Sequence, residues 1–246
     1  MTNDFHIRFR SSLALFAFFA VTSVFAAKFW ESKPYMEWSE KEALQVLNNS
    51  PWGDTHTITD TSQMFYQPTP RSAQPGDDRN INREVYRHFR IRWISAKPVR
   101  MAISRLTLLR AQKAGASNAA QEQDLKRFVD STFGDHIVIG IDFETNEQKY
   151  RGELFSLFAA MTIGDLQNNT YLVRASDGGK NFISEYYPPG DKGLGAQFVF
   201  PRNVKGEPFI TPASGTVRLV TNLRDRYSFT VLFKPKDMLF FGKLEY

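Results

Sequence analysis

The chain has 246 residues, 42% of them hydrophobic, and a formal net charge of +5 at pH 7; this composition suits one large globular domain or two small ones and excludes a disordered chain. It contains no cysteine, which excludes disulfides, thiolate metal sites, cysteine nucleophiles and lipid attachment through an N-terminal cysteine. Its 31 basic and 26 acidic residues are interspersed. Only the segment from Arg79 to Arg110 approaches the concentrated basic face of a nucleic-acid-binding protein, so no nucleic-acid partner is expected.

Residues 1–26 are predicted to be an export signal. Arg8 and Arg10 precede the apolar run LALFAFFAVTSVF at 13–25, and small residues follow it, which is the order typical of a secretory signal peptide. Cleavage near Ala26 would leave a periplasmic or secreted chain with a charge of +4, because two arginines and one aspartate are removed. The alternative is an uncleaved anchor, although the run is shorter than the ~20 residues of a spanning helix. Membrane contact is expected only in that second case.

Residues 27–52 are predicted to form an N-terminal segment with one capped helix. Ser39 suits the N-cap and Glu42 follows three residues later, which is the pattern of a capping box. Pro51 disfavours helical geometry at Ser50, so the helix should end there. The apolar stripe of this helix consists of Ala43, Leu44 and Leu47. Such a stripe should pack on the rest of the fold.

The same segment carries a motif, W-S-x-x-E-A-x-x-x-L-x-x-S-P-W, which runs from Trp38 to Trp52. Together with three further pieces it resembles a group of exported bacterial proteins of acidobacterial type. The three pieces are WISAKPVRMA (Trp93–Ala102), VFPR followed by G-x-P (Val199–Arg202, Gly206 and Pro208), and KDMLFFGKL (Lys236–Leu244). No activity or catalytic residue is assigned to this group, so the resemblance implies no chemistry.

Residues 53–82 are predicted to be a long polar loop. Prolines and a glycine gather in it at Pro68, Pro70, Pro75 and Gly76, and these residues are typical of irregular structure. The run THTITDTS at 55–62 could still contain a short strand, since threonine and isoleucine suit a pleated surface. Nothing in the loop identifies a ligand.

The segment from Arg83 to Ile94 alternates with the period of a half-buried strand. Its apolar face carries Val85, Phe89, Ile91 and Trp93, and its polar face carries Tyr86, His88, Arg90 and Arg92. This basic polar face has two interpretations. It is either an anion or partner contact, or, as we favour, a solvated sheet face paired to carboxylates across the sheet.

A helical hairpin over 95–114 and 118–133 should complete the segment 83–134. Pro98 suits the first helical turn, and Gly115 and Gly134 are natural C-terminal stops. The first helix has a core-facing stripe of Val99, Ala102, Ile103, Leu106 and Leu109, with Arg100, Ser104 and Arg105 away from its centre. The second helix has a stripe of Leu125, Phe128 and Val129. Because neither stripe can stay in water, the hairpin should pack against a sheet.

Residues 135–246 are predicted to be a β-rich domain with turn residues between short strands. The strand candidates are 136–143, 151–163, 169–175, 181–187, 197–200, 216–222, 227–234 and 237–244. The fold class that follows is α+β: an antiparallel β-sandwich or partly open barrel with a helical hairpin and a short N-terminal helix.

Candidates for chemistry are few. His56, His88 and His136 are far apart in sequence, and no pair has the helical spacing of zinc proteases, so no metal or cofactor is predicted. Asp142 and Glu144 fall two apart on a predicted strand and could face the same way, as paired carboxylates must for general acid/base catalysis. The same pattern is ordinary on a solvated sheet edge, which is the interpretation we favour. No catalytic residue is therefore predicted.

The 22 phenylalanines have two interpretations. Those of the β-rich half either fill a sandwich core or form in part an exposed patch for a partner. Phe240 and Phe241 are consecutive, so they cannot both point inward on one regular strand. Together with Arg87, Arg90 and Arg92 they make up the predicted partner surface.

The function that these observations favour is that of an exported, non-enzymatic envelope protein, a binding or adaptor module with an envelope protein as partner. One alternative is a hydrolase or carbohydrate-active domain that uses carboxylates such as Asp142 and Glu144. Another is a carrier of an apolar ligand, which requires an internal cavity of several hundred Å³. Oligomeric state and pathway do not follow from the sequence.

Overall fold

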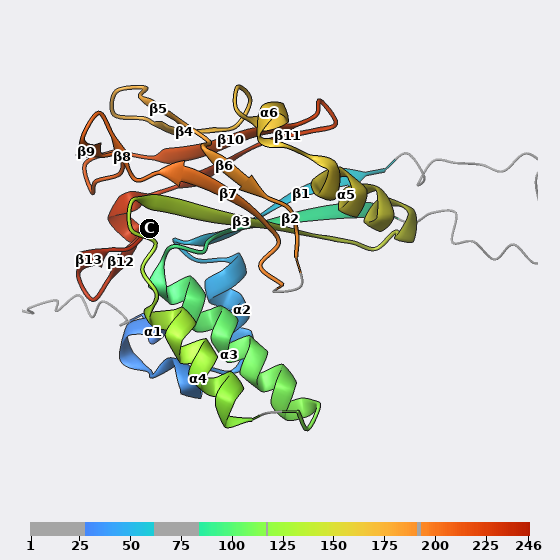
Figure 1. The fold of residues 1–246 in the computed structure, drawn as a ribbon, viewed down its shortest axis with the longest axis vertical. Coiled ribbons are helices and arrows are strands. Elements are labelled where there is room, and N and C mark those ends of the chain that lie inside the picture. Colours follow the sequence, from blue (N-terminus) through green and yellow to red (C-terminus); the bar gives the residue numbers. More distant parts are fainter. Residues whose placement is uncertain (1–27, 62–83, 117, 191–192) are drawn as a thin grey trace, which may run out of the picture.

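Two antiparallel sheets pack face to face, and helices cover part of the outer side of one of them (Figure 1). The computed structural model describes residues 28–61, 84–116, 118–190 and 193–246. The predicted fold class, an α+β sandwich with a helical hairpin and a short N-terminal helix, is confirmed. The predicted export segment and most of the predicted polar loop lie outside the described residues.

The larger sheet has five strands in the order β1-β2-β3-β7-β6. Their bounds are β1 Gly53–Asp60, β2 Val85–Trp93, β3 His136–Thr145, β7 Ala196–Pro201 and β6 Glu185–Tyr187. The smaller sheet has four strands in the order β11-β10-β4-β5. Their bounds are β11 Tyr227–Phe233, β10 Val217–Leu223, β4 Tyr171–Arg174 and β5 Lys180–Phe182. Strand β1 lies inside the predicted loop, where its threonines suit an edge strand.

Two short hairpins and the helices complete the described fold. The hairpins are β8 (Asn203–Val204) with β9 (Glu207–Pro208) and β12 (Leu239–Phe240) with β13 (Lys243–Leu244). The helices are α1 Phe29–Ser32, α2 Glu40–Asn48, α3 Lys97–Lys113, α4 Ala119–Asp130, α5 Gln148–Ala160 and α6 Ile163–Leu166, with single 3-10 turns at Tyr35–Glu37 and Pro235–Asp237. Strands from the N-terminal and C-terminal halves share one sheet and one core.

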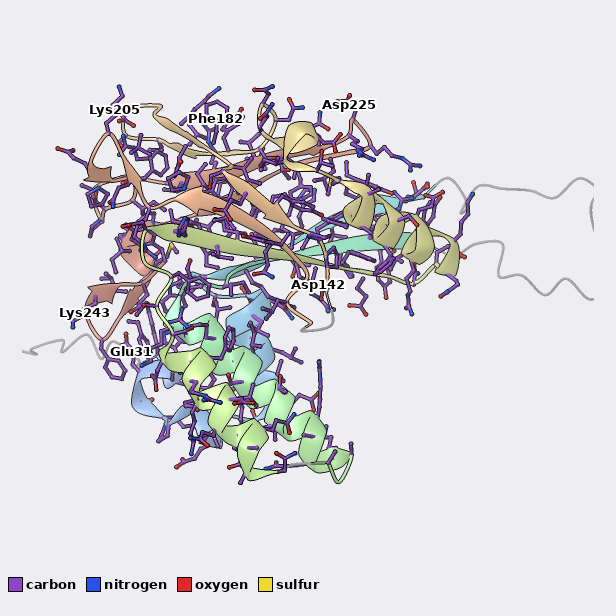
Figure 2. The ribbon with its side chains drawn as sticks, in the orientation of Figure 1. Glu31, Asp142, Phe182, Lys205, Asp225 and Lys243 are labelled. Carbon is purple, nitrogen blue, oxygen red and sulfur yellow. The ribbon has the colours of Figure 1, made fainter. Side chains whose placement is uncertain are left out.

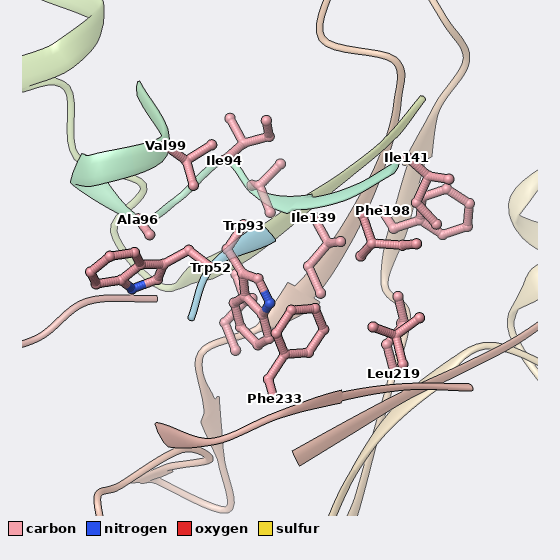
Figure 3. Close-up of a cluster of buried hydrophobic side chains, with 14 of the residues drawn as sticks. Trp52, Trp93, Ile94, Ala96, Val99, Ile139, Ile141, Phe198, Leu219 and Phe233 are labelled. Atoms are coloured by element: carbon pink, nitrogen blue, oxygen red, sulfur yellow. The ribbon is translucent and has the colours of Figure 1, made fainter. Parts of the chain in front are cut away.

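Aromatic rings fill the space between the two sheets. Phe89 on β2 lies 5.2 Å from Phe229 and 5.4 Å from Tyr227 on β11, measured between ring centroids. Trp93 lies 5.2 Å from Phe233 in an edge-to-face arrangement (Figure 3). Such pairs add about 0.5–1.5 kcal/mol each to the free energy of burial. The predicted apolar face of β2 therefore closes the sandwich.

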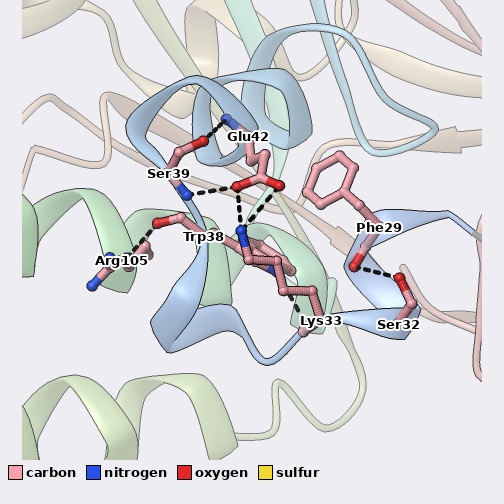
Figure 4. A network of polar contacts seen from close by, with 7 residues as sticks. All are labelled: Phe29, Ser32, Lys33, Trp38, Ser39, Glu42 and Arg105. Carbon is pink, nitrogen blue, oxygen red and sulfur yellow. Dashed lines mark hydrogen bonds and ion pairs between the residues drawn. The ribbon is translucent and has the colours of Figure 1, made fainter.

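The predicted capping box of α2 is confirmed (Figure 4). The Glu42 N–H donates to Ser39 Oγ at 3.2 Å, and the Ser39 N–H donates to the Glu42 carboxylate at 2.7 Å. Hydrogen bonding from Lys33 at 2.9 Å, assisted by Ser39, lowers the pKa of Glu42 to about 2. Next to the cap, Arg105 on α3 donates to the Trp38 carbonyl at 2.6 Å. The capped helix is thereby attached to the helical hairpin.

The hairpin of α3 and α4 buries two side chains that the sequence pattern places away from the centre of the apolar stripe of α3. Arg100 and Ser104 are only 5% and 0% exposed, because α4 covers that side of α3. The Arg100 guanidinium donates to the carbonyls of Val129 at 3.1 Å and Ile94 at 3.2 Å, and its burial lowers the pKa of Arg100. Arg100 therefore joins the end of α4 to the end of β2.

One predicted strand is wrong: residues 151–163 lie mostly in helix α5. Leu154, Leu157 and Phe158 are buried, and their spacing of three and four residues puts them on one face of a helix. Phe158 stacks on Phe143 of β3 at 5.5 Å. The turn residues around this segment suggested a strand, but the helical spacing of its apolar residues decides the structure.

Two further predicted strands are each interrupted. Residues 181–187 contribute to β5 and β6, which belong to different sheets. Residues 237–244 contain the hairpin of β12 and β13, where the chain reverses at Phe241 and Gly242 with φ angles of 47° and 74°. Two consecutive residues with positive φ are typical of a tight hairpin turn.

The core assignment predicts that Ile91→Ala lowers the free energy of unfolding by about 2–5 kcal/mol, because Ile91 is 0% exposed between the sheets. Leu232→Ala is the matched control, since Leu232 is 56% exposed and its loss should cost about 0.5 kcal/mol or less. Urea denaturation measures both. Equal effects of the two substitutions would contradict the assignment.

Candidate functional site

The basic residues on the outer face of β2 are paired with carboxylates on β3. Arg90 forms an ion pair with Glu144, and Arg92 lies 3.8 Å from the Asp142 carboxylate. Arg92 also donates to the Asn48 side chain at 2.9 Å, and burial lowers its pKa to about 10. These contacts match the second interpretation of the strand, a sheet face paired to carboxylates across the sheet.

Two of the predicted surface arginines are buried. Arg87 is 9% exposed and lies on the inward face of β2, where its guanidinium is 3.9 Å from the ring of Tyr150 and 5.9 Å from that of Tyr227. Arg92 is 8% exposed because α2 covers it. Contrary to the sequence-based expectation, neither side chain is available to a partner. Arg90 remains half-buried in its ion pair.

The two consecutive phenylalanines point in different directions, as predicted. Phe240 is 7% exposed and packs on Trp52 with ring centroids 6.4 Å apart. Phe241 is 66% exposed at the tip of the β12–β13 hairpin. Only Phe241 of this pair therefore contributes to the surface.

The outer face of the four-stranded sheet, called the open face below, carries a different set of side chains. Its residues are Tyr171, Val173, Lys180, Phe182, Arg218, Val220, Asn222, Ser228, Thr230 and Leu232. The register joins Thr230, Val220, Tyr171 and Phe182 in one row across the strands, and Leu232, Arg218, Val173 and Lys180 in the next. Figure 2 labels Phe182 on this side of the molecule.

The open face combines apolar groups with uncompensated positive charge. Phe182 is 45% exposed and Leu232 is 56% exposed. The rings of Tyr171 and Phe182 lie 5.3 Å apart, and the Lys180 ammonium is 4.4 Å from the Tyr171 ring. The face has no acidic residue, and within the described residues neither Lys180 nor Arg218 has an ion-pair partner. Its charge therefore remains available to an external anionic group.

The open face was not among the predicted sites, although the sequence contains a signal for it. Tyr171 alternates with Val173 in YLVR, and Arg218 alternates with Val220 and Asn222 in VRLVTNL, so the period of a strand puts each set on one face. What the sequence does not show is that these two strands are neighbours. Their pairing brings Tyr171 beside Val220 and Val173 beside Arg218.

The three histidines of the described chain have separate surroundings. His56 stacks on Phe229 at 5.2 Å, and His88 stacks on Tyr86 at 4.3 Å. His136 is exposed and lies 3.9 Å from Glu185. Nowhere in the described part of the chain do three or more His, Asp or Glu side chains gather closely enough to hold a metal ion.

Within the described residues, three of the surface hollows have volumes of about 580, 490 and 280 Å³. The largest of these three is lined by α5 together with Arg224 and Arg226. The second is lined by the β4–β5 and β8–β9 turns and contains Lys180 and Lys205. Their walls carry charged side chains, so none of these three is the apolar interior cavity that a carrier requires.

Comparison with family models, curated proteins and solved structures gave no match. The resemblance to an exported bacterial group therefore stays a prediction. Among the described helices, none has the length and apolar character needed to cross a bilayer. The segment predicted to direct export, residues 1–26, lies outside the described residues.

The surroundings of His56 predict a loss of stability in acid. Burial lowers the pKa of His56 below its ordinary value of 6.5, and Asp54 only partly opposes this. The unfolded chain therefore takes up the proton first as pH falls, and stability decreases from about pH 7 downward.

His56→Gln should reduce the difference between urea midpoints measured at pH 7.5 and pH 5.5, where these pH values bracket the ordinary histidine pKa of ~6.5. His136→Gln is the control, because the His136 side chain is 50% exposed. The same acid loss in His56→Gln as in the parent chain would contradict this account.

Proposed function

We propose that the protein is an exported, non-enzymatic binding module of the cell envelope, and that its open face binds the acidic surface of an envelope protein. The observation that carries the proposal is the pair of uncompensated cations, Lys180 and Arg218, beside the exposed Phe182 and Leu232. The signal-like segment 1–26 supports export, with cleavage near Ala26.

Aromatic residues and arginine are enriched at protein interfaces, where an apolar centre excludes water around charged contacts. The open face offers both kinds of group on a hydrogen-bonded sheet. Electrostatic complementarity would guide an acidic partner toward this face and fix its orientation. The outer face of the other sheet is less suitable, because Arg90 and Arg92 already contact carboxylates.

The hydrolase alternative receives less support. Asp142 and Glu144 do share one face, as acid/base catalysis requires. Each of them, however, already contacts an arginine, so both carboxylates take part in structural ion pairs. The carrier alternative is likewise less supported, since rings such as Phe89 and Phe229 fill the space between the sheets.

The open face predicts a specific pattern of partner capture. Arg218→Glu and Phe182→Ser should each reduce capture of one defined envelope protein about ten-fold or more, because interface arginines and aromatics are common hot spots. The matched controls are Arg127→Glu on α4 and Phe155→Ser on α5, both in exposed positions. Capture from cross-linked native envelopes, quantified by mass spectrometry, measures the effect.

Capture that persists in the open-face variants, or falls equally in the controls, would contradict the binding proposal. Turnover of a peptide, ester, glycoside or phosphate substrate by the purified protein, abolished by Glu144→Gln, would contradict the non-enzymatic assignment.

Export predicts that the protein isolated from its native envelope begins at or near Ala27. The intact mass of the isolated protein measures this directly. An N-terminus still at Met1 would contradict cleavage and favour the anchor.

A further inference from the structure

The register of the open face arranges its side chains in two parallel rows. The apolar row crosses three neighbouring strands, β10, β4 and β5, and consists of Val220, Tyr171 and Phe182. The cationic row crosses the same three strands and consists of Arg218, Val173 and Lys180. The two rows are two residues apart along each strand, which is about 6.6 Å. The face therefore presents an apolar line with a cationic line beside it.

The two cations of the cationic row are held apart by one strand. Neighbouring strands lie about 4.8 Å apart, so the Cα atoms of Arg218 and Lys180 are separated by about 9.6 Å. The Lys180 ammonium lies 4.4 Å from the centre of the Tyr171 ring, a favourable cation–π contact that keeps it over the face. Val173 between them is only 6% exposed. This row therefore offers a partner two separated charges and little apolar surface.

Carboxylates flank the open face at Asp177, Asp225 and Glu207. Asp177 accepts from Arg174 at 2.6 Å and from the Gly179 N–H at 2.9 Å. Asp225 accepts from the Asn222 side chain at 2.6 Å. Glu207 lines one hollow together with two lysines, Lys180 and Lys205. Within the described part of the chain, the two cations of the row thus keep a net positive charge.

The spacing of the two cations favours a helical partner. Residues i and i+7 of an α-helix lie on one side and rise about 10.5 Å along the axis, close to the separation of Arg218 and Lys180, whereas i and i+4 rise only about 6 Å. Same-side residues of an extended segment are about 6.7 or 13 Å apart, so they match less well. A helix is also about 10 Å wide, which is enough to cover both rows.

We propose that the open face binds an amphipathic helix of its partner, laid across strands β10, β4 and β5. The apolar stripe of this helix packs on the apolar row, and acidic residues at i and i+7 contact Arg218 and Lys180. This inference rests on the proposed function, because it names the kind of surface that the acidic envelope partner presents. The apolar contact supplies affinity, and the two ion pairs fix the position of the helix along the row.

Synthetic peptides of about 20 residues test the spacing directly. Two fluorescein-labelled peptides have the same composition, the same leucine stripe and a hydrocarbon staple that keeps both helical. One carries its two glutamates at i and i+7, and the other carries them at i and i+4. Fluorescence anisotropy with the full chain gives the Kd of each peptide.

The i+7 peptide should bind about three-fold more tightly or better, because only its glutamates reach both cations at once. Arg218→Gln and Lys180→Gln should each remove this preference, and high salt should weaken it. Arg127→Gln on α4 is the matched control, since Arg127 is exposed and lies outside the open face. It should keep the preference of the parent chain.

A charge exchange separates binding from folding. Arg218→Glu should lose the i+7 peptide and should bind a third peptide, with one glutamate and one lysine at i and i+7, more tightly than the parent chain does. Recovered binding of this kind requires a folded sheet. Failure of the third peptide to prefer Arg218→Glu would contradict a direct contact at position 218.

Equal affinity for the two glutamate spacings, or a preference that survives both glutamine substitutions, would overturn the helix inference. In that case the proposed function still stands if capture of the envelope protein depends on Arg218 and Phe182. Capture that ignores Arg218 and Phe182 contradicts the proposed function, whatever the peptides show. The two failures are therefore distinguishable.

Discussion

The other layers of the fold depend on strand β2, because one face of this strand packs against the four-stranded sheet and the other face contacts helix α2. Its inward face places Phe89 and Trp93 against the rings of β11 and so closes the sandwich. On its outward face, Arg92 donates a hydrogen bond to Asn48 at the end of α2, so this face contacts the helical layer. The period of two along a strand makes this division unavoidable, and a shift of one residue would exchange the faces.

The same period produces two outer surfaces that differ in their electrostatic character. On the five-stranded sheet, arginines of β2 face carboxylates of β3, so the charges compensate each other within the fold. On the four-stranded sheet, Lys180 and Arg218 stand beside Tyr171, Val220 and other uncharged side chains. A surface with unpaired charges can attract a charged partner. A surface whose charges already form ion pairs within the fold contributes mainly to the structure.

The two ends of the described chain meet at Trp52. Its indole N–H donates to the Glu245 carbonyl at 2.8 Å, and its ring packs on Trp30 and Phe240. This packing fixes the N-terminal helix and the C-terminal hairpin as one end of the domain.

Local patterns in the sequence determined the capped helix at Ser39, the hairpin helices, the alternation of β2 and the opposite directions of Phe240 and Phe241, because each depends on neighbours a few residues apart. The helical spacing of apolar residues in α5 is also a local pattern, but this segment was predicted to be a strand. Tertiary structure alone decided that α4 buries Arg100, that Arg87 turns inward beside Tyr150, and that β4 and β10 join their outward residues into the open face. These outcomes depend on pairing between segments far apart in the chain, which local periodicity does not encode.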